Sequence, residues 1–200
     1  MATEESKKIL ENIKARDYAI KKISKFFEYK TIMDYIYKIV DNFVFVINIE
    51  YFKVIISCKP LILDEMFWEI FEMLEKAKNQ PSSFHVKGTF TANTVTIDTF
   101  EIDSNISVEN EIKFSEIFTR INFVIDNYSK NVFDLNSFQE YIKNYENQYL
   151  NDILIDIINK KYKIALDKIN NCIKNRKDGH FSSNLKSIIE YAKEYCEKRI

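Results

Sequence analysis

Glycine and proline, the residues that most often interrupt regular structure, are scarce in this chain, which has two of each among 200 residues. Loops that bind phosphate through backbone amides need several glycines close together. Gly88 and Gly179 are far apart, so a P-loop and a dinucleotide-binding fingerprint are both excluded. Glycine also adopts positive φ without strain, and proline fixes a kink. We therefore expect few positions with positive φ or a fixed kink.

The rest of the composition is that of a folded protein with a substantial core. Apolar residues make up 46% of the chain, aromatic residues 14% and charged residues 30%. This apolar and aromatic content argues against disorder, and the length fits one domain. We therefore expect a single domain over residues 1–200.

Several features bear on where the protein works. Lysine outnumbers arginine by 25 to 4, and asparagine, isoleucine, tyrosine and phenylalanine are abundant. These five abundant types have A/T-rich codons, which points to an AT-rich genome, viral or low-GC bacterial. The three cysteines form no CxxC pair, which favours buried thiols in a reduced compartment, the cytoplasm of a bacterial or host cell. We expect no signal peptide, because the N-terminal residues lack an apolar core, and no membrane span.

Apolar residues spaced by three and four predict helices along most of the chain. The predicted helices are 5–29, 33–40, 64–77 with Asp64 as its cap, one from about 114, one after Asn136, 150–176, and a last one capped by Ser182 or Ser183. The last two are expected to pack as an antiparallel pair across the turn at Asp178-Gly179. Residues 134–200 are thus predicted to be a C-terminal helical region.

Residues 84–108 have a different pattern. Phe84, Val86 and later Val95 and Ile97 alternate with polar residues, which predicts a hairpin or meander with one solvent-facing side and an exposed His85. Segment 43–58 is rich in β-branched and aromatic residues, which favours two strands, but without a turn signal between them one long buried helix also fits. We predict an α+β fold, predominantly α-helical, with a small antiparallel β element inserted at 84–108 and a possible second part at 43–58.

Charge is segregated along the chain. Residues 41–126 carry 14 acidic and 7 basic side chains, whereas residues 159–177 carry 7 basic and 1 acidic. Three lysines of the basic stretch, Lys160, Lys163 and Lys174, lie opposite its apolar stripe and are expected to face solvent together. They predict salt-dependent, non-specific nucleic-acid binding, with an ordinary solvated helix face as the alternative.

One short motif resembles a known family. Arg176 and His180 flank Lys177-Asp178-Gly179 at the turn before the last helix. This arrangement resembles the motif of HEPN-type ribonucleases, helical bundles in which an arginine and a histidine begin a late helix. The resemblance implies a dimer in which the histidine activates a ribose 2′-hydroxyl and the arginine stabilises phosphate charge. It covers five residues, and with only three residues between Arg176 and His180 the spacing departs from the family.

The same region also carries candidate metal ligands. Cys172, His180 and Cys196 carry atoms that bind zinc. Both cysteines fall on the apolar stripes of their helices, where buried and unreactive cysteine is usual, and a fourth ligand is not evident. We therefore expect no metal and no cofactor.

The acidic middle of the chain offers a surface for a protein partner. Glu65, Glu69, Glu72 and Glu75 lie on the polar side of the helix predicted at 64–77, next to the exposed strand edges predicted at 84–108. No catalytic motif accompanies them. The preferred function is therefore a non-enzymatic accessory or interaction protein, in virus–host or phage–bacterium conflict. An HEPN-like ribonuclease and a nucleic-acid-binding protein are the alternatives, and the sequence does not indicate an oligomeric state.

Overall fold

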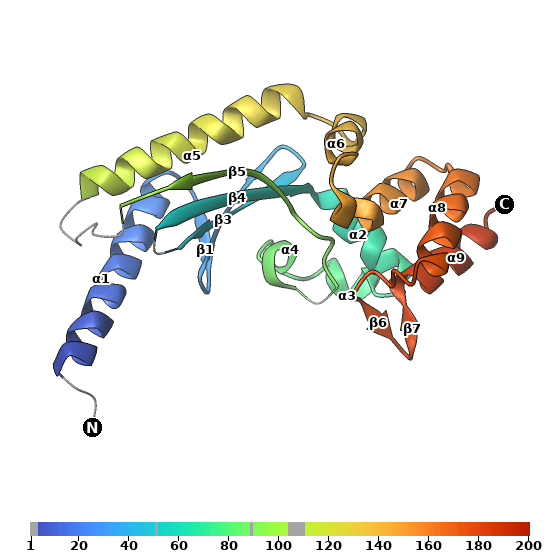
Figure 1. The fold of residues 1–200 in the computed structure, drawn as a ribbon, viewed down its shortest axis with the longest axis horizontal. Coiled ribbons are helices and arrows are strands. Elements are labelled where there is room, and N and C mark those ends of the chain that lie inside the picture. The colour runs from blue at the N-terminus through green and yellow to red at the C-terminus, as the bar shows by residue number, and fades with distance from the viewer. Residues whose placement is uncertain (1–3, 51, 89, 104–110) are drawn as a thin grey trace. The chain divides into compact units, whose positions relative to one another are not determined.

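The computed structural model of the protein describes residues 4–50, 52–88, 90–103 and 111–200. It is a mixed α+β fold, and more than half of it is helical. The helices are α1 (Glu4–Phe26), α2 (Leu61–Ile70), α3 (Leu74–Ala77), α4 (Phe84–Lys87), α5 (Glu111–Asn131), α6 (Leu135–Ile142), α7 (Tyr149–Ile158), α8 (Tyr162–Lys174) and α9 (Ile188–Glu197), with a short 3₁₀ turn at Glu146–Gln148 (Figure 1). The strands are β1 (Lys30–Ile32), β2 (Tyr35–Val40), β3 (Phe43–Ile49), β4 (Lys53–Pro60), β5 (Val95–Glu101), β6 (Ser182–Ser183) and β7 (Lys186–Ser187).

The chain groups into two compact units. The first comprises the described residues up to Val40 together with Phe45–Cys58 and Thr96–Lys130, and the second comprises Asp41–Val44, Lys59–Val95 and Asn131–Ile200. The first unit contains α1, α5 and most of the large sheet. The second contains the remaining helices and the small β6–β7 hairpin.

Five strands form one antiparallel sheet in the order β1-β2-β3-β4-β5. Segment 43–58 thus forms β3 and β4, which confirms the strand alternative for the described residues, Tyr51 lying outside them. Along β4, Val54, Ile56 and Cys58 are fully buried and the residues between them are partly exposed. This is the period-two pattern of a strand with one face in the core.

The helix predicted at 33–40 is wrong. Residues 30–40 form the hairpin β1–β2, in which Thr31 pairs with Ile36, and Met33 lies in the turn with φ 50°. The tyrosine, isoleucine and valine side chains of β2 fit a pleated sheet well. Over so short a segment, apolar spacing does not distinguish one turn of helix from a strand.

The β insert predicted at 84–108 is also wrong in its first half. Residues Phe84–Lys87 form the short helix α4, and among the described residues of this segment only Val95–Glu101 is a strand, β5, which joins the large sheet instead of forming a hairpin of its own. The rings of Phe84 and His85 pack on Trp68, with centroids 5.3 and 5.1 Å from it, and these tertiary contacts override the weak alternation. Thr89 and residues 104–108 of the predicted insert lie outside the described residues.

The core of the first unit forms where α5 packs on the sheet and on the end of α1. Phe118 of α5 is fully buried, with its ring 5.6 Å from Phe27 and 5.5 Å from Tyr29. The Tyr29 hydroxyl donates to Asn122 Oδ1 at 2.7 Å, and Arg120 lies 4.0 Å above the Phe100 ring of β5. Helix α5 therefore contacts both the α1–β1 connection and the edge strand β5.

The core of the second unit is helical. Helix α7 buries its apolar residues from Leu150 to Ile157, and α8 and α9 pack against each other as the sequence predicts. The single helix predicted at 150–176 is broken, because Lys160 adopts φ 58° between α7 and α8. The last helix begins at Ile188 and not after Ser182 or Ser183. Its cap is Ser187, which with Glu190 forms a capping box, so the earlier serines are free to form β6.

Positive φ is common in this glycine-poor chain, contrary to the expectation of few such positions. The described non-glycine residues with positive φ are Glu28, Met33, Asp41, Glu72, Phe90, Lys160, Arg176, His180, Asn184 and Leu185. The left-handed conformation costs a side chain about 1–2 kcal/mol. The fold therefore contains left-handed turns, and non-glycine residues occupy their positive-φ positions.

Replacing Leu185 by glycine should raise the free energy of unfolding by about 1 kcal/mol. Leu185 has φ 64° in the turn between β6 and β7, and its side chain is fully exposed, so the change relieves strain without removing packing. Urea denaturation of the two proteins measures the difference. Ile164→Gly, at a half-exposed site inside α8, is the control and should lose about 1 kcal/mol. An unchanged or lower midpoint for Leu185→Gly would contradict the prediction.

Candidate functional site

A buried ion pair joins the end of β4 to helix α2 in the second unit. Lys59 and Asp64 are 1% and 0% exposed, and the Lys59 Nζ donates to Asp64 Oδ1 at 2.8 Å. Removing two charges from water is costly unless good geometry and further hydrogen bonds compensate. Burial lowers the pKa of Lys59, and the charge of Asp64 opposes this shift.

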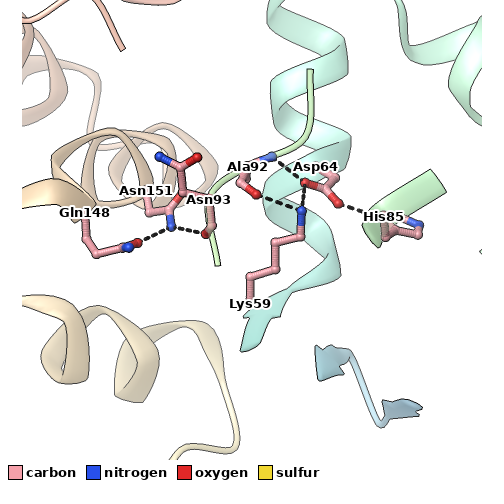
Figure 2. A network of polar contacts seen from close by, with 7 residues as sticks. All are labelled: Lys59, Asp64, His85, Ala92, Asn93, Gln148 and Asn151. Atoms are coloured by element: carbon pink, nitrogen blue, oxygen red, sulfur yellow. Dashed lines mark hydrogen bonds and ion pairs between the residues drawn. The ribbon is translucent and has the colours of Figure 1, made fainter. Parts of the chain in front are cut away.

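Further hydrogen bonds complete what we call the Asp64 network: Lys59, Asp64, His85 and Ala92 (Figure 2). Asp64 Oδ1 also accepts from the Ala92 amide at 2.6 Å, and Oδ2 is 2.8 Å from His85 Nδ1. The Lys59 ammonium donates a second bond, to the Ala92 carbonyl, at 2.7 Å. One carboxylate thus connects α2 with β4, α4 and the segment before β5.

The network fixes the hydrogen-bonding roles of His85. An ionised carboxylate only accepts hydrogen bonds, so the Nδ1 atom that faces Asp64 must carry a proton. In the neutral imidazole, Nε2 is then an acceptor. The side chain is 18% exposed and its ring packs on Trp68, so its position is held from two sides.

A second polar cluster holds the segment after Ala92. Asn151 Nδ2 donates to the Asn93 carbonyl at 2.7 Å and to Gln148 Oε1 at 2.6 Å (Figure 2). Gln148 Nε2 in turn donates to the Thr94 carbonyl at 3.1 Å. Residues 92–94 are therefore held by side chains on both sides, from α2 and from the start of α7.

A cavity of about 410 Å³ lies beside the Asp64 network, and we call it the α2 cavity. Its lining includes Glu65, Trp68 and Glu69 of α2, Lys78 and Gln80 after α3, and His85 of α4. Glu65 is exposed whereas Trp68 is 3% exposed, so the lining runs from the surface to a buried aromatic ring. The cavity thus combines carboxylates, an imidazole and an indole.

Two lining groups have unused hydrogen-bonding capacity. The Trp68 Nε1–H, though buried, donates to no atom among the residues that the structure describes. Within the same part of the chain, the Glu65 carboxylate has no hydrogen bond and no ion pair. Buried polar groups without a partner are unusual in proteins, so the Trp68 donor is a distinctive feature of this lining, whereas the exposed Glu65 carboxylate is a solvated charge beside it.

The four glutamates predicted to bind a partner are divided by the structure. Glu65 and Glu69 line the α2 cavity, but α2 ends at Ile70, so the single helix face predicted for all four is wrong. Glu72 is a left-handed residue after α2, and Glu75 lies in α3, paired with Lys78 at 2.6 Å. A continuous helix did not form because the chain turns at Glu72, whose amide bonds back to the Glu69 carbonyl.

Glu69 already has partners on its other side. Its Oε1 accepts from the Tyr195 hydroxyl at 2.5 Å and lies 3.8 Å from an Arg199 nitrogen. Burial and the nearby Glu69 carboxylate raise the pKa of Tyr195 to about 12. Glu69 thus contributes charge to the cavity while tying α2 to α9.

The three lysines predicted to bind nucleic acid are all exposed, but they do not lie on one helix. Lys160 is in the left-handed turn before α8, while Lys163 and Lys174 are in α8, three turns apart and so on one side. Another lysine of the stretch, Lys168, is 2.6 Å from Asp152 and 2.5 Å from Asp156, which partly neutralises the charge.

Arg176 and His180 lie in the loop between α8 and β6, each with positive φ. The resemblance to HEPN-type ribonucleases implies that they begin a late helix, but the next helix begins only at Ile188, because β6 and β7 intervene. The His180 side chain is 84% exposed, whereas Cys172 and Cys196 are buried. Burial raises the pKa of the Cys196 thiol to about 11, as expected of an unreactive core cysteine.

Sequence reasoning missed Lys59, Asp64 and His85 as a group. Asp64 was interpreted as a helix cap and His85 as an exposed strand residue. One signal was available, because Asp64 is three and four residues before Phe67 and Trp68 and therefore on the buried stripe of α2. A charged residue on a buried stripe requires a buried partner.

Comparisons with known proteins do not narrow the function. No family model, no curated protein and no solved structure matches the chain. Among the described residues, none of the helices has the length and apolar character needed to span a membrane. The chemistry of the α2 cavity is therefore the basis for a functional proposal.

Proposed function

We propose that this protein is an interaction module that binds a basic side chain of another protein in the α2 cavity. The observation that carries the proposal is the placement of two carboxylates, Glu65 and Glu69, and the Trp68 indole around one cavity. Carboxylates attract a cation, and the attraction is stronger beside buried protein than in bulk water, because the effective dielectric constant is lower there.

The dimensions and charge of the cavity support this proposal. Its volume of about 410 Å³ lies within the range of about 300–1,000 Å³ typical of ligand sites. Glu65 is free to pair with a cation, because it has no ion pair with a described residue. Lys78, the basic residue on the lining, is 2.6 Å from Glu75, so its charge is partly neutralised.

The Asp64 network supports the proposal in a second way. Through Asp64 and its three hydrogen-bond donors, contacts within the chain tie together α2, α4 and the segment at Ala92. A cavity whose walls are already ordered avoids the entropy cost of forming them on binding. Binding of a single side chain, which forms few contacts, is then not weakened by the entropy cost of ordering the cavity walls.

Glu65→Gln should weaken binding of a basic peptide about tenfold, the equivalent of about 1.4 kcal/mol. The probe is a nine-residue Gly/Ser peptide with one central arginine, titrated while the fluorescence of Trp68, the one tryptophan of the chain, is followed. Glu65 touches no described partner, so the loss reflects the cavity and not the fold. Glu72→Gln removes the same charge from an exposed position outside the cavity lining and should leave the affinity unchanged.

Two results would count against the proposal. Absence of any Trp68 response to the peptide at millimolar concentration would remove the cavity as a site for basic side chains. An equal loss of affinity in Glu65→Gln and Glu72→Gln would show that the peptide responds to overall acidity and not to this cavity. A circular dichroism spectrum of each variant checks that the fold is retained.

A further inference from the structure

The acceptors around the α2 cavity come from two elements and not from one helix face. Glu65 and Glu69 belong to α2, and His85 belongs to α4. A ligand that satisfies all three must offer hydrogen-bond donors in several directions. Lysine has a compact ammonium with three donors, whereas arginine has a planar guanidinium with five donors in a fixed fork.

We infer that the α2 cavity is selective for arginine over lysine and that the Nε2 atom of His85 is the acceptor that makes the difference. The inference rests on the proposed function and specifies its ligand. His85 Nδ1 is 2.8 Å from Asp64 Oδ2, so in its neutral form the ring presents Nε2 as an acceptor, and no described residue hydrogen-bonds to that atom. Because Asp64 is fully buried and held by Lys59 and Ala92, the imidazole cannot rotate without breaking this network.

The aromatic surface of the cavity favours the same ligand. The rings of Trp68 and His85 line the cavity with their centroids 5.1 Å apart, and Phe84, which is not on the lining, packs on Trp68 at 5.3 Å. A planar guanidinium stacks on such rings and is less strongly hydrated than an ammonium, so it loses less on leaving water. The arrangement therefore favours arginine through the several donors in its plane and through contact of its face with the His85 ring, which is 18% exposed.

The test uses two nine-residue Gly/Ser peptides, one with a central arginine and one with a central lysine. Each peptide is titrated into the intact protein. We expect the arginine peptide to bind at least about tenfold more tightly in the Trp68 fluorescence assay. His85→Asn retains an amide N–H where Nδ1 donates to Asp64 but has no atom equivalent to Nε2. In this variant the preference for arginine should fall to within about threefold.

A measurement on the unmodified protein keeps the inference testable if His85→Asn does not fold. In ¹⁵N-histidine NMR spectra, His85 should be the neutral form protonated at Nδ1, and its Nε2 signal should shift with the arginine peptide but not with the lysine peptide. His180→Asn assigns the two histidines. A His85 protonated at Nε2 in the free protein would overturn the inference.

The two proposals fail in different ways. If both peptides bind equally and Glu65→Gln weakens both, the cavity binds basic side chains but the selectivity assigned to His85 is wrong. If lysine binds more tightly, the selectivity is likewise wrong. If neither peptide binds, the proposed function and the inference that rests on it are both wrong.

Discussion

Replacing Asp64 by asparagine is expected to lower the free energy of unfolding by about 3–5 kcal/mol, the cost of leaving a buried charge unpaired. Lys59 is 1% exposed, and the Asp64 carboxylate is its charged partner. Asparagine keeps the size of the side chain but removes the negative charge and one of the acceptors that His85 and Ala92 use. Urea denaturation followed by Trp68 fluorescence measures the loss.

A matched pair of variants separates charge from packing. In Lys59→Met/Asp64→Leu both charges are absent, and apolar replacement of a buried pair is often nearly neutral. This double variant should therefore be more stable than Asp64→Asn, even though it carries more changes. If the double variant is the less stable of the two, the hydrogen bonds of Lys59 and Asp64 to Ala92 and His85 contribute more to stability than the unpaired charge costs.

The same variant should respond to pH in a defined direction. Burial lowers the pKa of Lys59, and removing Asp64 removes the charge that opposes this shift. The unfolded chain then binds a proton that the folded chain lacks, so stability increases with pH. The gain should appear as the pH rises from neutral toward the ordinary pKa of lysine, and it should be larger in Asp64→Asn than in the unmodified protein.

Phe118→Ala should lower the free energy of unfolding by about 3–5 kcal/mol, because a fully buried aromatic ring is replaced by a cavity. Its ring packs against Phe27 and Tyr29 in the first unit, so the substitution weakens the contact of α5 with the α1–β1 connection. Far-UV circular dichroism in urea reports this loss, since the unit is rich in regular structure.

A phenylalanine on the same helix supplies the control. Phe123 is 65% exposed, and its replacement by alanine should change the stability by less than about 0.5 kcal/mol. Similar losses for Phe118→Ala and Phe123→Ala would contradict the packing described for α5. A larger loss for Phe123→Ala would mean that its exposed face is covered in solution.

Long periodic segments were the part of the fold that the sequence predicted well. The helix expected at 5–29 is α1, and the one expected from about 114 is α5, because in each many apolar residues repeat at helical spacing. Short segments were predicted poorly. At 33–40 and 84–87 only a few residues define the period, and contacts with distant residues such as Trp68 decide the conformation.

The candidate site was predictable only in part. Glu65 and Glu69 were identified because exposed glutamates repeat along an amphipathic helix, and that pattern is local. The Asp64 network joins residues 21 and 28 positions apart, Asp64 to His85 and to Ala92, through contacts that no local pattern encodes. The helix break at Glu72 was missed for a related reason, since nothing in its side chain indicates a left-handed backbone.

The left-handed turns made without glycine also have a consequence for the unfolded chain. Glycine loses more backbone freedom on folding than any other residue, and replacing it stiffens the denatured ensemble. With two glycines in 200 residues, this polypeptide has unusually little such freedom to lose. The glycine-poor denatured chain has less backbone entropy to lose on folding. This smaller entropy cost partly offsets the strain at positions such as Met33 and Lys160.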